Sequence, residues 1–275
     1  MKLDSLMTKI AMGAAPCVLG IDMGYTSLPL EFMRAYSDKA DAVRNFNRTL
    51  LGAICDIIPA VSINVSALLP YGTETVADAV SYAKEKGLFT IVDAKCNGAP
   101  NEAKSAAELY FDAMGADCVT VCPYFGIDGL SPIFEREDKS VIVVARAEYG
   151  APSEVSDLVA GTRSVWRAVA EKANRLAEER VGTMGYSEIC ISLGGVANAT
   201  LSEMRRTYKK LPILVTGYDG EKTAARDISG AFDMKGLGGL VYVSRIITEP
   251  EGEGAYTERV RASAEKTARE LKICF

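Results

Sequence analysis

The chain contains no histidine among its 275 residues. Mechanisms that need an imidazole are therefore excluded, among them the Ser-His-Asp triad, the Cys-His proteases and metal sites with His ligands. Any proton transfer must fall to Asp, Glu, Lys, Tyr or Cys side chains.

Paired cysteines are also missing. The seven cysteines are odd in number and include no C-x-x-C pair, and most lie in apolar runs such as Cys17-Val18-Leu19-Gly20. This pattern predicts free thiols that act as small buried side chains in a reducing compartment, and it supports no disulfide framework. It also lacks the ligand spacing of a zinc site, so we predict no metal centre.

Neither a secretory signal nor a membrane span is evident. An acid follows closely in Met1-Lys2-Leu3-Asp4, where a signal peptide needs a purely basic stretch, and no apolar run reaches the roughly 18 residues of a membrane helix. The net charge of −5 gives no general attraction to nucleic acid or to anionic membranes. We therefore expect a cytoplasmic protein whose partner is a small molecule.

What the chain does contain is a regular alternation of short apolar runs with longer segments of helical period. The runs are nearly continuous in hydrophobicity, as parallel strands buried on both faces are. The predicted strands are Cys17–Asp22, Ile57–Ile63, Phe89–Asp93, Cys118–Cys122, Val141–Ala145, Glu188–Leu193, Ile213–Thr216 and Gly239–Val243. The predicted helices are Asp38–Ala53, Glu74–Lys86, Asn101–Met114, Asp157–Glu179, Ser202–Lys210, Thr223–Phe232 and Tyr256–Lys272.

Eight strands, seven of them followed by a helical segment, predict an α/β fold: a single (β/α)8 barrel, or TIM barrel, over residues 1–275. An open dinucleotide-binding sheet would carry G-x-G-x-x-G after its first strand, and Gly20-Ile21-Asp22-Met23-Gly24-Tyr25 lacks that pattern. We also expect Asn101 to cap a helix and Gly87 to end one.

Polar residues at the carboxyl ends of the predicted strands are the candidates for chemistry, because the active sites of such barrels lie there. Asp93 and Lys95 are two apart, so both are predicted to project into the barrel mouth and to form a pair. An ammonium held by a carboxylate is a plausible proton donor, and the alternative is a structural salt bridge. Asp22 ends the first strand and is a candidate ligand group, with a loop hydrogen bond as the alternative.

A phosphate site is predicted after the last two strands. Arg245 follows the eighth strand, where an arginine suits bidentate phosphate binding, unless it is an ordinary surface residue. Gly217 and Gly220 follow the seventh strand and would let backbone amides approach an anion.

Several blocks resemble the orotidine 5′-phosphate decarboxylase family, above all its longer-chain bacterial subgroup, over most of the chain and in order. They are Gly20-Ile21-Asp22, the stretch from Cys55 through Asn64 to Gly72, Asp93-Ala94-Lys95, the stretch 116–128 (A-D-C-V-T-V-C-P-Y-F-G-I-D), and Val243-Ser244-Arg245-Ile246-Ile247. The resemblance implies a cofactor-independent decarboxylation of orotidine monophosphate to UMP by a homodimer of barrels. It implies that Lys95 donates the proton, Asp93 orients Lys95, Asp22 binds the ribose and Arg245 grips the phosphate.

The chain departs from the family pattern at several site positions. The family array is Lys-Asp-Lys-Asp, with the last Asp and a nearby Thr lent by the partner subunit. Its first Lys falls on Ser62, the last Asp on Gly98 and the Thr on Glu102, while a Ser that contacts the base falls near Glu148. The phosphate loop lacks its Gln. By position, Ser62, Asn64 and Glu148 remain candidate substrate-binding residues.

These observations leave three hypotheses. The first is an orotidine 5′-phosphate decarboxylase-like lyase, and the second is a diverged barrel enzyme acting on another phosphorylated nucleotide or sugar. In the second, acids near the mouth would hold Mg²⁺; they are Asp22, Asp93, Glu148 and Asp219. The third is a nucleotide-binding homologue without catalysis.

Overall fold

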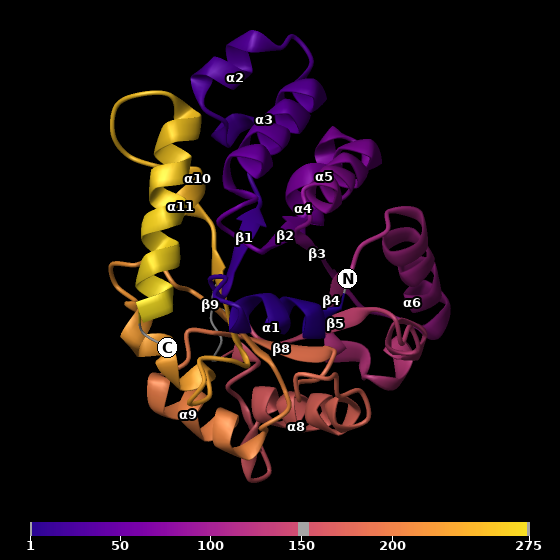
Figure 1. The fold of residues 1–275 in the computed structure, drawn as a ribbon. Coiled ribbons are helices and arrows are strands. Elements are labelled where there is room, and N and C mark those ends of the chain that lie inside the picture. Colours follow the sequence, from indigo (N-terminus) through magenta and orange to yellow (C-terminus); the bar gives the residue numbers. More distant parts are fainter. Residues whose placement is uncertain (1, 148–153, 274–275) are drawn as a thin grey trace.

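The computed structural model describes residues 2–147 and 154–273. Within these residues, eight parallel strands close into one barrel in the order β1-β10-β9-β8-β5-β4-β3-β2 (Figure 1). The strands are β1 Cys17–Ile21, β2 Ala60–Asn64, β3 Phe89–Cys96, β4 Cys118–Val121, β5 Ser140–Arg146, β8 Ile189–Gly194, β9 Ile213–Thr216 and β10 Gly239–Val243. Because β1 pairs with both β2 and β10, the sheet has no free edge. The predicted (β/α)8 barrel is confirmed.

Helices surround the barrel and pack their apolar faces on the outward side chains of the strands (Figure 1). The longer ones are α3 Lys39–Ile54, α5 Thr73–Glu85, α6 Pro100–Ala107 with a π-helical continuation Glu108–Ala113, α8 Val165–Glu178, α9 Asn198–Thr207 and α11 Tyr256–Ile273. The shorter ones are α2 Leu30–Ala35, α4 Val65–Leu68, α7 Ser131–Phe134 and α10 Arg245–Thr248.

Some predicted boundaries were wrong, for local reasons. The second strand begins at Ala60 rather than Ile57, because the amides of Ile57 and Ile58 still bond to the end of α3 and Pro59 has no N–H. The segment predicted as helix from Asp157 folds first into a small hairpin, β6 Val159–Ala160 with β7 Arg163–Ser164, before α8. The segment Thr223–Phe232 is a 3-10 helix over Ala225–Ala231.

Helix termini gave one correct and one wrong prediction. Gly87 ends α5 with a positive φ of 75°, as predicted. Asn101 is not the N-cap of α6, because the helix begins one residue earlier at Pro100 with Ala99 as N-cap. Proline fits the first helical turn, where its missing N–H costs nothing.

The helix α1, Leu3–Ala11, was not predicted, and neither were the short helices α2, α4, α7 and α10. The helix α1 lies across the amino-terminal end of the barrel (Figure 1). Its apolar face, Leu3, Leu6, Met7 and Ile10, packs against the side chains that fill the barrel interior: Val18, Ala60, Phe89, Ile91, Cys118, Ile142, Cys190, Leu214 and Leu240. The buried Glu188 carboxylate accepts the Leu3 amide at 2.8 Å and the Ser140 hydroxyl at 2.6 Å. A distant carboxylate therefore caps α1 and closes this end of the barrel.

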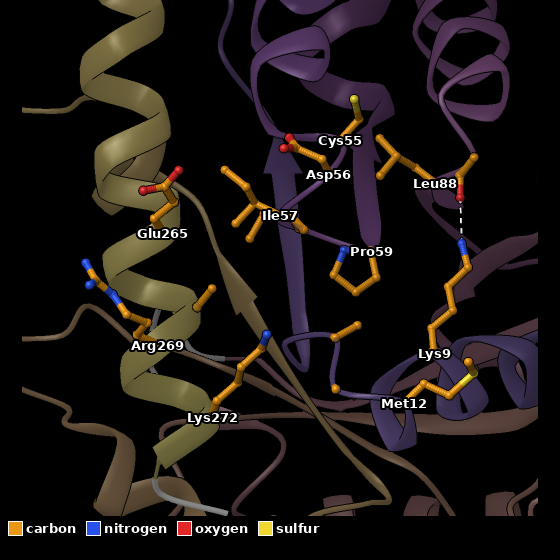
Figure 2. Close-up of a pocket in the computed structure, with 15 residues that line it drawn as sticks. Lys9, Met12, Cys55, Asp56, Ile57, Pro59, Leu88, Glu265, Arg269 and Lys272 are labelled. Atoms are coloured by element: carbon orange, nitrogen blue, oxygen red, sulfur yellow. Dashed lines mark hydrogen bonds between the residues drawn. The ribbon is translucent and has the colours of Figure 1, made fainter.

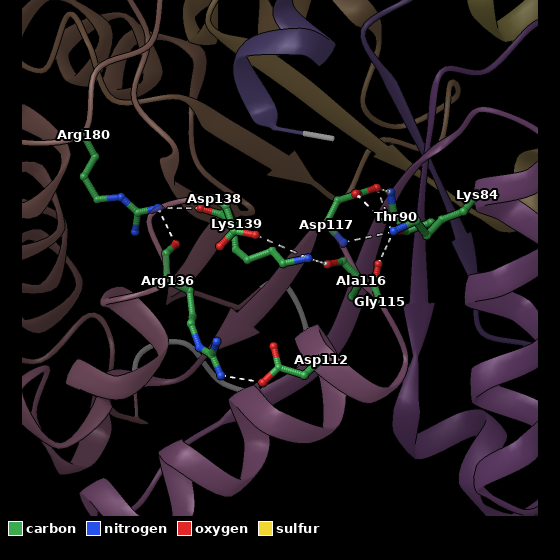
Figure 3. A network of polar contacts seen from close by, with 10 residues as sticks. All are labelled: Lys84, Thr90, Asp112, Gly115, Ala116, Asp117, Arg136, Asp138, Lys139 and Arg180. Atoms are coloured by element: carbon green, nitrogen blue, oxygen red, sulfur yellow. Dashed lines mark hydrogen bonds and ion pairs between the residues drawn. The ribbon is translucent and has the colours of Figure 1, made fainter.

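A polar network on the outside of β3–β5 is also structural (Figure 3). The buried Asp117 accepts the amide of Thr90 at 3.0 Å and its hydroxyl at 2.9 Å, and Lys84 lies 3.7 Å away. Nearby, the Arg180 guanidinium donates to the carbonyls of Phe134 and Arg136 at 2.9 Å. Asp117 belongs to a block that resembles the family, yet its role here is to tie strand starts together.

The cysteines within the described ranges are free thiols, and most are buried. Burial raises the pKa of Cys17 and of Cys190 to about 12, so both stay protonated at neutral pH. This agrees with the prediction of inert, buried side chains.

Candidate active site

The carboxyl ends of the strands bring Asp93 and Lys95 together, as predicted. The Lys95 Nζ lies 2.6 Å from Asp93 Oδ2 at the end of β3. The Asp93 side chain is 16% exposed and that of Lys95 is 53% exposed, so the ammonium reaches solvent while its partner is largely enclosed. Because the Lys95 end is solvated, the ion pair adds little to stability.

The local backbone that forms this pair was not predicted. Lys95 has a φ of +47° and lies in a bulge between Val92 and Cys96, where the register with β4 shifts. Left-handed backbone is uncommon for lysine and costs about 1 kcal/mol or more. The bulge turns the lysine side chain back onto Asp93, two residues earlier, so the pair depends on the bulge and not on simple strand alternation.

Thr120 holds this arrangement, and sequence reasoning missed it. Its hydroxyl donates to Asp93 Oδ1 at 2.7 Å and accepts the Lys95 amide at 2.8 Å. One side chain on β4 therefore fixes both the carboxylate and the strained backbone. Two signals were available: Thr120 lies at the inward face of an otherwise apolar strand, and it belongs to the stretch 116–128 that resembles the family.

Asp22 lies at the mouth between β1 and β10. Its carboxylate accepts the Ser244 hydroxyl at 2.8 and 2.9 Å and the Tyr242 hydroxyl at 3.1 Å. Both donors are neutral, so the negative charge of Asp22 is not paired by them. The carboxylate remains able to accept further hydrogen bonds at the open mouth.

The predicted phosphate residues lie beside each other. Arg245 is the exposed first residue of α10, and no hydrogen bond or ion pair of its guanidinium to another residue of 2–147 or 154–273 is found. Gly217 and Gly220 both have positive φ, 94° and 75°. A Cβ at Gly220 would lie 2.8 Å from the Ile246 side chain, so this loop packs directly against α10.

Part of that loop is already occupied by a side chain. Asp219 Oδ1 accepts the amides of Glu221, Lys222 and Thr223 at 3.1, 2.8 and 2.9 Å. These bonds, above all that from Thr223, lower the pKa of Asp219 below its usual value. The amides most suited to an incoming anion are therefore turned toward Asp219.

The remaining candidates differ in their surroundings. Ser62 is 5% exposed, and its register partner is Gly20 of β1. Asn64 pairs in register with Asp93, and its side-chain oxygen caps α4 by accepting the Ala67 amide at 3.2 Å. Glu148 lies outside the described residues.

Gly98 and Glu102, two positions at which the chain differs from the family pattern, are in direct contact at the start of α6. Gly98 has a φ of +111°, and a Cβ there would lie 2.0 Å from Glu102 Oε2. That carboxylate accepts the Ala99 amide at 2.7 Å and so caps α6. An aspartate at position 98 would be strained by the positive φ, and the Glu102 carboxylate would have to move from its capping position.

Arg146 closes the other side of the mouth, and it was also missed. Its guanidinium pairs with Asp157 at 2.8 and 2.9 Å and donates to the carbonyls of Gly194 and Gly195 at the end of β8. The hydrogen bond from Arg146 is the main reason that the pKa of Asp157 lies below its usual value. The arginine thus ties the segment that follows β5 to β8.

This ion pair has a defined pH dependence. Because the folded state lowers the pKa of Asp157, its stabilisation is complete above the unfolded pKa near 4 and is lost as the pH falls through the folded value. We expect Asp157→Asn to lower the free energy of unfolding by up to about 1 kcal/mol at pH 6, a small effect because the pair is partly solvated. Urea unfolding from pH 6 to pH 3 measures this, and a difference that persists unchanged at pH 3 would contradict the assignment.

Metal ligands do not gather at the mouth in the parts of the chain that the structure describes. No group of three or more His, Cys, Asp or Glu side chains placed to hold an ion occurs within residues 2–147 and 154–273.

No helix in these ranges is long and apolar enough to cross a bilayer.

A groove of about 690 Å³ lies at the opposite end of the barrel, between α1 and α11 (Figure 2). It contains none of the predicted site residues. Lys9 at its edge donates to the Gly87 carbonyl at 2.7 Å, and its acids Asp56 and Glu265 both pair with Arg261. Its polar groups are largely engaged, so the mouth remains the candidate active site.

Together the fold and the mouth define a class: a (β/α)8-barrel protein with an aspartate–lysine pair on its third strand and an exposed arginine after its last. Comparison with known proteins identifies the family within this class. The chain belongs to the orotidine 5′-phosphate decarboxylase / HUMPS family, whose sequence model matches residues 47–259.

Individual relatives agree with this assignment. The chain is 30% identical over 256 residues to an orotidine 5′-phosphate decarboxylase of Clostridium perfringens, with 89% of this chain and 87% of that protein covered. It is 27% identical to one of Rhodopirellula baltica, with 86% and 83% covered. The structure of OMP decarboxylase from Leishmania donovani is similar, with a TM-score of 0.77, 22% identity and coverage of 100% and 98%, which shows the shared fold.

Proposed function

We propose that this chain decarboxylates orotidine 5′-phosphate to UMP without a cofactor, with Lys95 as the proton donor. The observation that carries the proposal is the contact of 2.6 Å between Lys95 and Asp93 at the barrel mouth. Membership of the family and the named activity of its relatives support the reaction type.

The chemistry assigns a separate task to each group. The bond between the pyrimidine ring and its carboxylate breaks, CO2 leaves, and the electron pair stays on the ring carbon. Lys95 Nζ delivers a proton to that carbon, and the exposed amine that remains then takes a proton from solvent. Asp93, fixed by Thr120, holds the Lys95 side chain in place, and the fixed charges favour the transition state.

The rest of the mouth binds the substrate. Asp22 accepts the ribose hydroxyls, and Arg245 grips the phosphate with the help of the loop at Gly217 and Gly220. Ser62, Asn64 and Glu148 are assigned to the pyrimidine and ribose by their positions in the family pattern. Catalysis and binding then lie on different strands of one rim.

The departures at Ser62 and Gly98 favour one alternative: a diverged enzyme that acts on another phosphorylated nucleotide or on a sugar phosphate with Mg²⁺. The two are separated by following the loss of orotidine 5′-phosphate absorbance with EDTA and with Mg²⁺. The proposal predicts the same turnover in both. No turnover in either buffer, with Mg²⁺-dependent conversion of a sugar phosphate, would replace it by the alternative.

We further propose that the protein is a homodimer in which a second copy covers part of the mouth. Large apolar side chains are exposed there, with Leu69 following β2 at 47% and Tyr124 and Phe125 following β4 at 62% and 75%. Burying such residues favours association. Sedimentation equilibrium is expected to give twice the chain mass of 29.5 kDa, and a monomer would contradict this.

A further inference from the structure

Tyr242 has an unusual place in the barrel. Its neighbours in β10, Val241 and Val243, pack outward with the helices, whereas Leu240 and Tyr242 belong with the side chains that fill the interior. Tyr242 is the register partner of Val18 on β1. Its ring therefore lies on the apolar floor of the mouth, and its hydroxyl extends to Asp22.

Gly20 makes room for that ring. A Cβ at Gly20 would lie 2.1 Å from the Tyr242 hydroxyl oxygen and 2.5 Å from the adjacent ring carbon. No other residue type fits without displacing the phenol. Gly20 pairs in register with Ser62 of the neighbouring strand β2.

The hydroxyl groups of Tyr242 and Ser244 leave Asp22 with a defined orientation. Both donate to it and so fix the orientation of a carboxylate that is partly exposed at the end of β1. A carboxylate held in this way is suited to accept hydrogen bonds from two adjacent hydroxyl groups of a sugar. The exposed cation Arg245 follows Ser244 directly.

We infer that Tyr242 is a specificity-determining residue, which positions Asp22 and with it reads the vicinal diol of a phosphorylated ribose. This rests on the proposed function, because it assigns the sugar end of the same site. A competing explanation is that the bond merely closes the seam between β1 and β10. In that case its loss would lower stability without altering the choice among ligands.

The test compares the binding of UMP with that of its 2′,3′-dideoxy analogue by titration calorimetry. The wild type is expected to prefer UMP by about tenfold or more, the value of one hydrogen bond to a charged group. Tyr242→Phe should reduce this preference to about threefold or less. Gly20→Ala should reduce the preference for UMP in the same way, because the added methyl group displaces the Tyr242 ring while Asp22 itself is unchanged.

Tyr186→Phe is the matched control, because it removes a similar bond, 2.6 Å to Asp233, near the other end of the barrel. It should leave the preference for UMP unchanged. A Tyr242→Phe protein that keeps the wild-type preference would overturn the inference and leave the proposed function intact. A wild type that binds both compounds equally would overturn the inference and also the proposed role of Asp22, while leaving the proposed decarboxylation untouched. A wild type that binds neither would overturn the proposed function and this inference with it.

Discussion

Lys95→Ala is expected to slow the decarboxylation of orotidine 5′-phosphate by a factor of about 10² to 10⁴, the range over which a positioned acid accelerates proton transfer. The loss should appear in kcat, because the ammonium acts on the ring carbon as charge develops there. The fold should survive, since the Lys95 side chain is half exposed and its ion pair contributes little to stability.

Lys104→Ala provides the control. Lys104 is an exposed lysine on α6 that lies 4.0 Å from Glu108, so the substitution removes a similar charge and a similar ion pair outside the mouth. Its activity should match that of the wild type. Equal activity of the Lys95→Ala and Lys104→Ala proteins would show that another group delivers the proton.

Arg245→Ala is expected to weaken the binding of UMP by about 10- to 100-fold, the value of one or two hydrogen bonds between a guanidinium and a phosphate. Uridine, which has no phosphate, should bind the variant and the wild type equally. Arg245→Lys should recover only part of the loss, because an ammonium lacks the paired donors of the guanidinium.

Arg226→Ala controls for the general effect of charge, since Arg226 is an arginine whose side chain is 86% exposed. The preference for UMP over uridine should be unchanged in it. If Arg245→Ala kept that preference as well, the phosphate site would have to be sought elsewhere on the rim.

The closed barrel and the central pair were predictable because they depend on short-range patterns. Parallel strands buried on both faces leave continuous apolar runs, and a polar residue at the end of such a run marks the rim. Asp93 and Lys95 are in contact, as predicted, but the contact depends on the bulge and on the positive φ of Lys95, which their spacing did not indicate.

Features that depend on distant partners were not predictable. The helix α1 is short and its N-cap, Lys2, offers no side-chain cap; it is held by Glu188, which is 185 residues from Leu3. Likewise Thr120 and Tyr242 look like ordinary strand residues, and only the closed barrel shows that they hold Asp93 and Asp22. Propensity and periodicity carry no information about such contacts.

The departures from the family pattern now have a physical description. A side chain at position 98 would need left-handed backbone and would displace the Glu102 carboxylate from the cap of α6. Restoring the missing aspartate alone would therefore strain the backbone there. With half of the family array absent, we expect slower turnover than in a member with the full array.

Decarboxylation by Lys95 is tested most directly by the release of carboxyl-labelled CO2 from orotidine 5′-phosphate in the presence of EDTA, with wild type and Lys95→Ala measured side by side. We expect release by the wild type and a rate lower by at least about 10² in the variant. Equal release by both proteins, or none by the wild type, would contradict it.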